Sequence, residues 1–415
     1  MMKQRPTGDL QYVQRMNRRL ILETLLNQGP MSKIDISRTT TLSPTTVGNA
    51  ITELQSENLV QEVGKVASPL GRRPTLLDIQ WNSRSAIGLA VVDNKVVGIR
   101  TNVAASIQKA SIHEFSVDRD ITKIFQMVIE ELLSGVDATT VIGIGLATPG
   151  VLDRQLGEIE TIANFPWRHL KFPGSILKDR AIPSFIENDT NAAALGEAYF
   201  GRGRQMNSFC YVHVGTGVGA GVIVDRHIML GSRGYAGEIG HMTVDRHGTK
   251  CRCGNSGCLE AYVSWRAIAE FLKNEAVHPR YKDLENVIDR GGFLKAVYES
   301  GRKNEVFANV ADMLSTGIAA LISMVDPEMV IVEGIYEKCD HFMKQVEEQT
   351  HFRLTNIVHD KPKIVTGELG EFASVAGIIA MILERNGFLR SQESLLASPY
   401  DFQVAQIQEY AVAMQ

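Results

Sequence analysis

Two short segments decide how this chain folds: Gly237-Glu238-Ile239-Gly240-His241 and Cys251-Arg252-Cys253-Gly254-Asn255-Ser256-Gly257-Cys258-Leu259-Glu260. Three cysteines within eight residues, with a histidine ten residues before the first, supply four nitrogen and sulfur ligands. Four such ligands form the closed tetrahedral set of a structural zinc site, and the glycines permit tight turns. The sequence therefore predicts one structural Zn²⁺ per chain, held by His241, Cys251, Cys253 and Cys258. The alternative is three buried thiols beside a histidine.

The rest of the cysteine inventory agrees with a metal site better than with disulfides. The chain has five cysteines, an odd number, and its first residues contain no apolar signal-peptide core. The apolar run 372–383 is shorter than the ~20 residues that cross a bilayer. We therefore expect a cytoplasmic protein with no membrane partner.

Length and composition indicate several ordinary globular domains. The 415 residues are 44% apolar and 22% charged, which excludes a disordered or collagen-like chain. The net charge is −4, yet residues 1–80 carry +3 and the remainder −7. A basic end on an acidic body suggests two functions in one chain.

The first eighty residues predict a winged helix-turn-helix. Apolar spacing favours a helix at 12–28, and Ser32 with Asp35 favours the start of a short second helix. Ser43 followed by Pro44 is typical of an N-cap and first turn of a third helix, extending to about residue 58. Such a helix enters the major groove with its amino end first. We expect base contacts from Ser43, Thr45, Thr46 and Asn49.

Two strands, at 59–66 and 75–79, would complete the wing. The loop between them contains Arg72 and Arg73 among glycine and proline, a composition suited to phosphates or a narrow minor groove. The alternative is a three-helix interaction module that binds no DNA.

From residue 85 onward strands and helices alternate, which predicts an α/β body. Strands are expected at 86–92, 96–100, 141–147, 184–186, 208–214 and 329–333, with a further strand ending at 225. Helices are expected at 121–133, 189–200, 306–325 and 372–386.

Two polar segments of the body are candidate binding sites. Glu187-Asn188-Asp189 lies at a strand-to-helix junction, where a carboxylate and an amide could bind adjacent hydroxyls. The alternative is a helix N-cap, for which these residues are equally suited. The glycine-rich loop 215–221 could hold phosphate through its backbone N–H groups, although such clusters also mark hairpin turns.

Together these motifs resemble the ROK family of repressors, open reading frames and kinases. The matching blocks are Gly237–His241, Cys251–Glu260, Glu187–Glu197 and Pro149-Gly150. A winged helix ahead of them resembles the repressor branch, which includes xylose, N-acetylglucosamine and glucose regulators. The resemblance implies a two-lobed actin/hexokinase-like (ribonuclease H-like) body with a sugar cleft. It also implies sugar contacts from Asn188, Asp189, Glu238, His241 and Glu260.

This resemblance suggests domain boundaries. We expect a winged helix at 1–80, a first α/β lobe at 81–198 rejoined by a helix near 372–390, and a second lobe at 199–371. The zinc knuckle 241–258 would belong to the second lobe.

The segments that correspond to the nucleotide-binding loops of the family kinases have a different sequence in this chain. Ala90 replaces the aspartate of their phosphate loop, and Val92 and Asp93 replace its glycines. Side chains there would block close approach to phosphate, and Asp93 would add repulsion. The segment 332–336 also lacks the Gly-Gly pair of the kinases. A retained sugar site without a phosphoryl donor predicts a sensor and not an enzyme.

We therefore predict a sugar-responsive transcriptional repressor of carbohydrate-utilisation genes. It would bind double-stranded operator DNA as a homodimer or tetramer and leave it when a sugar or sugar phosphate binds. Two alternatives remain open: an ATP-dependent sugar kinase with a regulatory domain, and a repressor controlled by a phosphotransferase protein.

Overall fold

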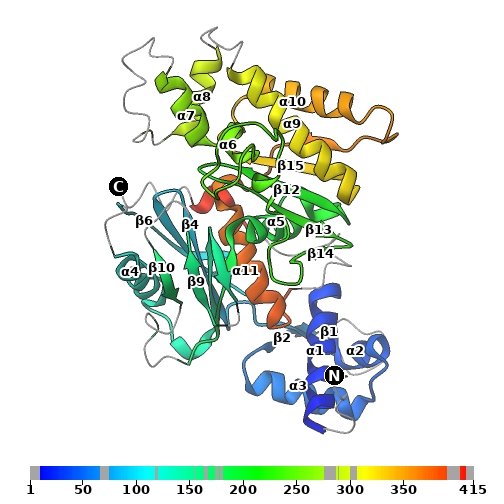
Figure 1. The fold of residues 1–415 in the computed structure, drawn as a ribbon. Helices are drawn as coiled ribbons and strands as arrows, with labels where there is room; N and C mark the ends of the chain where they lie inside the picture. Colours follow the sequence, from blue (N-terminus) through cyan, green and yellow to red (C-terminus); the bar gives the residue numbers. More distant parts are fainter. Residues whose placement is uncertain are drawn as a thin grey trace.

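The structure is a computed structural model, and it describes residues 10–65, 74–116, 120–154, 156–162, 167–172, 177, 181–274, 287, 289–299, 306–389 and 402–407. Figure 1 shows a small N-terminal unit below two larger α/β lobes, with helices α5 and α11 between the lobes.

The N-terminal unit is a winged helix-turn-helix. Its helices are α1 (Leu10–Gln28), α2 (Lys33–Thr40) and α3 (Pro44–Ser56). Its strands are β1 (Met31–Ser32), β2 (Val60–Lys65) and β3 (Thr75–Ile79), which form an antiparallel sheet in the order β1-β3-β2. The three predicted helices and the two predicted strands are present, and β1 is an additional short strand.

The two predicted helix caps are present. The Ser32 side chain accepts a hydrogen bond from the Asp35 backbone N–H at 3.3 Å, and Ser43 accepts one from the Thr46 N–H at 3.1 Å. Between the two helices Thr41 has φ 58°, the left-handed conformation that ends α2. Local hydrogen bonding therefore defines where α2 and α3 begin, and Thr41 defines where α2 ends.

The first lobe is built on a five-stranded sheet in the order β11-β7-β4-β5-β6. The strands are β4 (Ser85–Val92), β5 (Lys95–Asn102), β6 (Ile107–Glu114), β7 (Val141–Thr148) and β11 (Ser184–Asn188). Alternate residues of β4 enter different cores. Ile87, Leu89 and Val91 pack with helix α4 (Ile121–Leu133), whereas Ala86 and Ala90 pack with helix α11 (Ala373–Arg385). Helices therefore cover both faces of this sheet.

A smaller antiparallel sheet extends from the first lobe. It contains β8 (Val151–Asp153), β9 (Glu158–Thr161) and β10 (Arg168–Lys171) in the order β10-β9-β8. Because β8 follows β7 after a short turn, this sheet stands beside the carboxyl ends of β7 and β11.

The second lobe is built on a sheet in the order β14-β13-β12-β15-β16. The strands are β12 (Phe209–Val214), β13 (Val218–Val224), β14 (His227–Ile228), β15 (Met329–Gly334) and β16 (Lys363–Val365). The helices are α6 (Glu260–Val263), α7 (Trp265–Asn274), α8 (Arg290–Glu299), α9 (Val306–Val325) and α10 (Asp340–Arg353). In the described residues, α9 alone has the length and apolar composition to cross a membrane. More than half of its most apolar stretch is buried, as in the core helix of a globular lobe.

Two helices join the lobes. Helix α5 (Asp189–Phe200) packs on β12 and β13, α11 packs on β4 and β7, and the two helices pack on each other. A Cβ atom at Gly377 would lie 1.7 Å from the Ala192 carbonyl oxygen, and one at Gly196 would lie 2.2 Å from the Ala373 oxygen. The two backbones are therefore in direct contact. The domain boundaries suggested at residues 80, 198 and 371 stay predictions.

The winged helix shares its apolar core with the first lobe. Leu25 and Leu54 of the winged helix belong to the same buried cluster as Val97 and Ile379 of the lobe. The Arg84 guanidinium donates to the Glu57 carbonyl oxygen at 2.8 Å, at the end of α3. The winged helix and the first lobe are therefore joined both by shared apolar packing and by this hydrogen bond.

Buried carboxyl groups anchor the loop that enters α11. Glu197 of α5, which is fully buried, accepts hydrogen bonds from the backbone N–H groups of Glu368 and Leu369, both at 2.9 Å. Glu333 at the end of β15 accepts one from Gly367 at 2.7 Å. Burial, assisted by a hydrogen bond with Glu337, raises the pKa of Glu333 to about 9.

The raised pKa of Glu333 predicts that stability falls as pH rises. Between its ordinary value and about 9, Glu333 binds a proton in the folded chain and not in the unfolded chain. Its contribution to the free energy of unfolding is therefore lost as pH rises through that window. Glu333→Gln should flatten the decline of melting temperature between pH 6 and pH 9. The exposed Glu348→Gln is the control, and a decline equal to that of the wild type in both variants would contradict the assignment.

Candidate functional site

The four predicted metal ligands converge. One ligand atom from each of His241, Cys251, Cys253 and Cys258 lies within 4.8 Å of the other three. The Sγ atoms of Cys253 and Cys258 are 3.7 Å apart, and Cys251 Sγ is 3.9 Å from His241 Nδ1. A tetrahedron with metal–sulfur bonds of ~2.3 Å has an edge of about 3.8 Å. The spacing thus fits a tetrahedrally bound metal ion.

Backbone turns bring these ligands together. Gly254 and Gly257 have φ values of 95° and 70°, a conformation that side chains rarely adopt. A Cβ at Gly257 would also lie 1.6 Å from the Asp245 carbonyl oxygen. The Asn255 backbone N–H lowers the pKa of Cys253, which favours the thiolate that binds metal.

A small cavity opens between the first lobe and the loop that follows β14. It is lined by Gly150, Val151, Leu152, Arg154, Asn188, Gly234, Tyr235 and Glu238. Strands β7 and β11 run parallel with Thr148 beside Asn188, so their carboxyl ends meet at this cavity. Crevices at the carboxyl ends of parallel strands are common ligand sites.

Asn188 serves first as a helix cap. Its side-chain oxygen accepts hydrogen bonds from the Thr190 N–H at 3.0 Å and the Asn191 N–H at 3.1 Å. The N-cap alternative is thus correct for its oxygen, while the residue still lines the cavity. Asp189 follows as the first residue of α5. Burial raises its pKa, and the charge of His213 opposes that shift.

The acidic residues predicted to bind sugar lie within electrostatic range of one another. Burial raises the pKa of Glu238, His241 opposes that shift, and the charges of Asp189 and Glu260 add to it. Glu238 is nevertheless exposed to solvent. A side chain such as that of Glu238, which is surrounded by protein atoms and still accessible to solvent, is typical of the wall of a cleft. Of the five predicted residues, Asn188 and Glu238 line the cavity, while Asp189, His241 and Glu260 lie within electrostatic range of Glu238; their role in sugar binding stays a prediction.

The glycine-rich loop has a packing explanation. A Cβ at Gly221 would lie 2.4 Å from the Ala194 Cβ, so this glycine lets β13 approach α5. The Glu260 carboxylate accepts a hydrogen bond from the Val218 N–H at 3.0 Å and thereby holds the loop. These contacts account for the loop without a phosphate.

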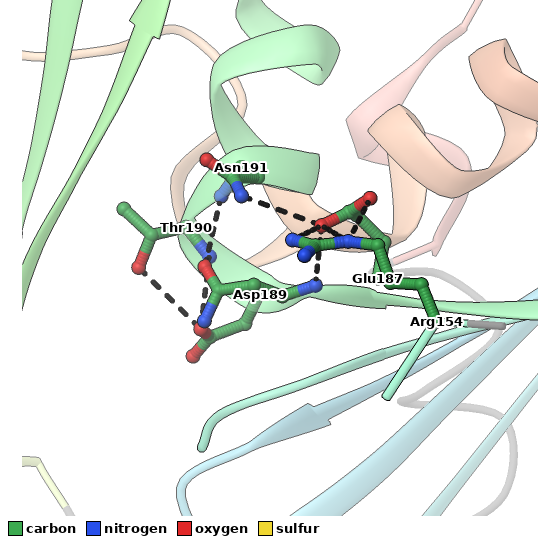
Figure 2. Close-up of polar contacts among 6 residues, drawn as sticks. Arg154, Glu187, Asp189, Thr190 and Asn191 are labelled. Carbon is green, nitrogen blue, oxygen red and sulfur yellow. Dashed lines mark hydrogen bonds and ion pairs between the residues drawn. The ribbon is translucent and has the colours of Figure 1, made fainter. Parts of the chain in front are cut away.

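Arg154 is a site residue that the sequence did not reveal. Its guanidinium forms an ion pair with the buried Glu187, and Glu187 also accepts from the Asn188 N–H at 2.9 Å and Asn191 Nδ2 at 3.3 Å. Figure 2 shows the guanidinium beside the Glu187 carboxylate, near the start of α5. Arg154 and Glu187 are 33 residues apart and belong to no shared motif, so local patterns carry no signal for the pair.

The segment 90–93, where the family kinases have their phosphate loop, contains an ion pair that the sequence did not predict. Ala90 is fully buried in β4, which agrees with the expectation that phosphate cannot approach the backbone there. Asp93, however, forms an ion pair with Arg290 of α8 at 2.5 Å. The repulsion expected from Asp93 stays a prediction, and the ion pair with Arg290 across the two lobes reduces it.

The recognition helix presents part of the predicted DNA-binding set to solvent. Thr45 and Asn49 are exposed and Thr46 is half-buried. The Ser43 hydroxyl is 2.8 Å from the Thr46 hydroxyl and already caps α3. Arg72 and Arg73 lie outside the described residues.

Comparisons with known proteins agree with these features. The ROK family profile matches residues 99–385. A xylose repressor from Bacillus spizizenii is 30% identical over 91% of this chain and 97% of that protein. A glucokinase from Thermotoga maritima is 28% identical over 73% of this chain and 95% of that protein. The alignment with the glucokinase leaves more of this chain unmatched than the alignment with the xylose repressor does. The difference is about the length of the winged helix.

A solved structure extends the similarity to the whole fold. A ROK family transcriptional regulator, described as a homolog of the E. coli MLC protein, superposes with a TM-score of 0.75. The superposition covers 93% of this chain and 98% of that one, at 22% identity, and therefore supports the fold. On the evidence of its sequence profile, its two-lobed architecture and its histidine–cysteine cluster, the chain belongs to the ROK family.

Proposed function

We propose that this protein is a sugar-responsive transcriptional repressor of carbohydrate-utilisation genes. The observation that carries the proposal is the joining of a winged helix to a ROK body through one continuous apolar core. The full-length xylose repressor relative supports it, because that similarity spans both parts of the chain.

Operator DNA is bound by the winged helix. Thr45, Thr46 and Asn49 contact bases, Ser43 fixes the amino end of α3, and Arg72 and Arg73 contact the backbone from the wing. The protein acts in the cytoplasm as a homodimer or tetramer, with operator half-sites related by its symmetry.

The effector binds in the cleft between the lobes. Its hydroxyl groups are bound by Asn188, Asp189, Glu238, His241 and Glu260. The sugar must bind more tightly to the DNA-incompetent state, because only a difference in affinity shifts the population. Closure of the cleft moves the first lobe, and the shared core carries that movement to α3.

The metal is a structural Zn²⁺ bound by His241, Cys251, Cys253 and Cys258. Zinc would hold the segments that carry these four ligands together. Four protein ligands leave no open coordination position for a substrate, so the site is structural. The histidine orients the segment that carries Glu238, and Cys258 is followed closely by Glu260. The knuckle therefore positions two carboxylates of the cleft.

A sugar kinase is the second candidate, because the family contains glucokinases. The buried Ala90 and the Asp93–Arg290 ion pair favour the repressor, since both occupy the place of the kinase phosphate loop. A repressor controlled by a phosphotransferase protein would keep the DNA-binding unit and would not respond to free sugar.

Metal content tests the knuckle. Elemental analysis should find one zinc per purified chain, and Cys253→Ser should lower both zinc content and sugar response. Cys339→Ser, at a cysteine outside the cluster, should keep the metal. Wild-type protein with far less than one zinc per chain would refute the assignment.

The wing arginines should contribute affinity without sequence preference. Arg72→Ala combined with Arg73→Ala should weaken binding to all duplexes and lower the salt slope by roughly one to two units. Fluorescence anisotropy over a salt series measures this. Lys344→Ala with Lys363→Ala, on the second lobe, removes the same charge away from the head. Unchanged slopes in the wing variant would exclude a DNA contact there.

Asp189 should be needed for induction. Charge-assisted hydrogen bonds contribute ~1.5–3 kcal/mol, so Asp189→Ala should raise the sugar Kd roughly tenfold to a hundredfold. Operator release, titrated with sugar by anisotropy, should then require correspondingly more sugar. Asp340→Ala, at the start of α10, is the matched control.

The same preparations distinguish the kinase alternative. A coupled ADP-release assay with common hexoses and pentoses should show no sugar-dependent turnover. Turnover that depends on Asp189 would replace the repressor mechanism by catalysis, and release of DNA by Asp189→Ala at the wild-type sugar concentration would exclude this cleft as the sensor.

A further inference from the structure

We propose that the outer face of helix α1 is a contact between two copies of this chain, and that this contact pairs their winged helices. The outer face is defined by Tyr12, Val13, Met16 and Leu20, and Leu10 extends it toward the start of the helix. The inference adds an interaction surface to the proposed function and does not depend on the ligand of the cleft.

Helix α1 is apolar on two opposite sides. Ile21 and Leu25 are fully buried and belong to the core that the winged helix shares with the first lobe. With 3.6 residues per turn, Val13, Met16 and Leu20 lie on the opposite side of the helix. These three residues are 49%, 48% and 38% exposed. A helix that packs against one core needs only one apolar side, so the second side requires a partner of its own.

Exposed apolar side chains are concentrated in the winged helix. Among the described residues, fifteen large apolar residues are exposed, and seven of them lie within residues 10–65. Five of those seven belong to the first half of α1, within residues 10–20. Single apolar residues are normal on a protein surface, whereas a contiguous patch marks a site of interaction.

The area of the outer face suits a symmetric contact. From their exposed fractions the five residues expose roughly 500 Å², so two such faces would bury about the 1,000 Å² that a specific interface needs. Val13, Met16 and Leu20 follow the spacing i, i+3, i+7, which is the spacing of a short coiled-coil seam. One self-complementary helix face is what a two-fold axis requires of each copy.

The charges around the outer face favour a second copy over DNA. None of the five residues of the face is charged. Arg19 forms an ion pair with Glu23 at 2.7 Å, and Arg18 forms ion pairs with Glu57 and, at 3.8 Å, with Glu53. Two copies can therefore approach without bringing unbalanced charges of these residues together. A surface that binds phosphates needs free lysine or arginine side chains instead.

The outer face lies away from the base-reading end of α3. Arg18, in the same part of α1, pairs with Glu53 and Glu57 at the carboxyl end of α3, whereas Thr45 and Asn49 lie near its amino end. Figure 1 shows the winged helix below the two lobes. A contact through α1 thus leaves the predicted base-contacting residues accessible. It also fixes the separation of the two recognition helices, which sets the spacing of operator half-sites.

Cross-linking of the full-length protein tests the contact in solution. Met16→Cys, near the middle of the outer face, is treated with a flexible bismaleimide that spans two packed helices, whose axes are ~8–10 Å apart. A covalent dimer is the expected product. The wild type controls for the native cysteines, and Lys123→Cys, exposed on α4, controls for random collision. No covalent dimer in Met16→Cys, or an equal yield in either control, would overturn the inference.

Charged variants test the apolar character of the outer face. Met16→Lys combined with Leu20→Lys keeps good helix formers but places like charges across the two-fold contact. The ratio of affinities for a palindromic duplex and for its single half-site should fall at least about tenfold. Added lysine by itself strengthens binding to any duplex, so a fall in this ratio has its cause in the lost contact.

Fluorescence anisotropy measures the ratio with a palindromic duplex that the wild type selects from random sequence. Met127→Lys combined with Leu156→Lys adds the same charge at exposed apolar positions of the first lobe and should keep the wild-type ratio. Circular dichroism establishes that both variants are folded. A wild-type ratio in folded protein carrying Met16→Lys and Leu20→Lys would show that α1 does not pair the winged helices. If the wild type selects no duplex, the proposed function fails and cross-linking alone decides the contact.

Discussion

Backbone contact between α5 and α11 is the constraint on which the rest of the structure depends. Gly196 and Gly377 allow the two helices to touch without intervening side chains. Each helix covers the sheet of a different lobe, so their contact fixes the distance between the lobes. Any larger residue at either glycine would press on a carbonyl group of the partner helix and separate the lobes.

Helix α5 links the cavity wall to the loop that enters α11. Its amino end carries Asn188 as the cap and Asp189 as the first residue, where a helix N-terminus favours negative charge. Its carboxyl end carries Glu197, which binds the loop leading into α11. A ligand that moves the amino end of α5 therefore acts on the same rigid element that holds α11, and α11 packs on the lobe that bears the winged helix.

Local sequence signals predicted the elements of the winged helix and the metal cluster, but they gave no expectation for β8 to β10, α7, α8 or α10. Capping residues such as Ser32 and Ser43 form hydrogen bonds with backbone groups only three residues away, so a short stretch of sequence predicts them. The spacing of Cys251, Cys253 and Cys258 likewise predicts a metal cluster within one short segment. The sequence could not predict contacts formed across the chain. Arg154 meets Glu187, and Arg290 meets Asp93, which lies 197 residues away. Such pairs form only when segments far apart in the sequence meet in the folded chain.

The Asp93–Arg290 and Arg154–Glu187 ion pairs show how one scaffold can serve two chemistries. A kinase needs positive charge and open backbone where phosphate passes between the lobes. In this chain Arg290 forms an ion pair with Asp93, and Arg154 forms one with Glu187. The charges of these two arginines are therefore already balanced by carboxylates. Among the described residues that line the cavity, Arg154 is the one cation, and it is paired with Glu187. In the proposed repressor, the free energy of closure around a sugar would go into moving the DNA-binding unit.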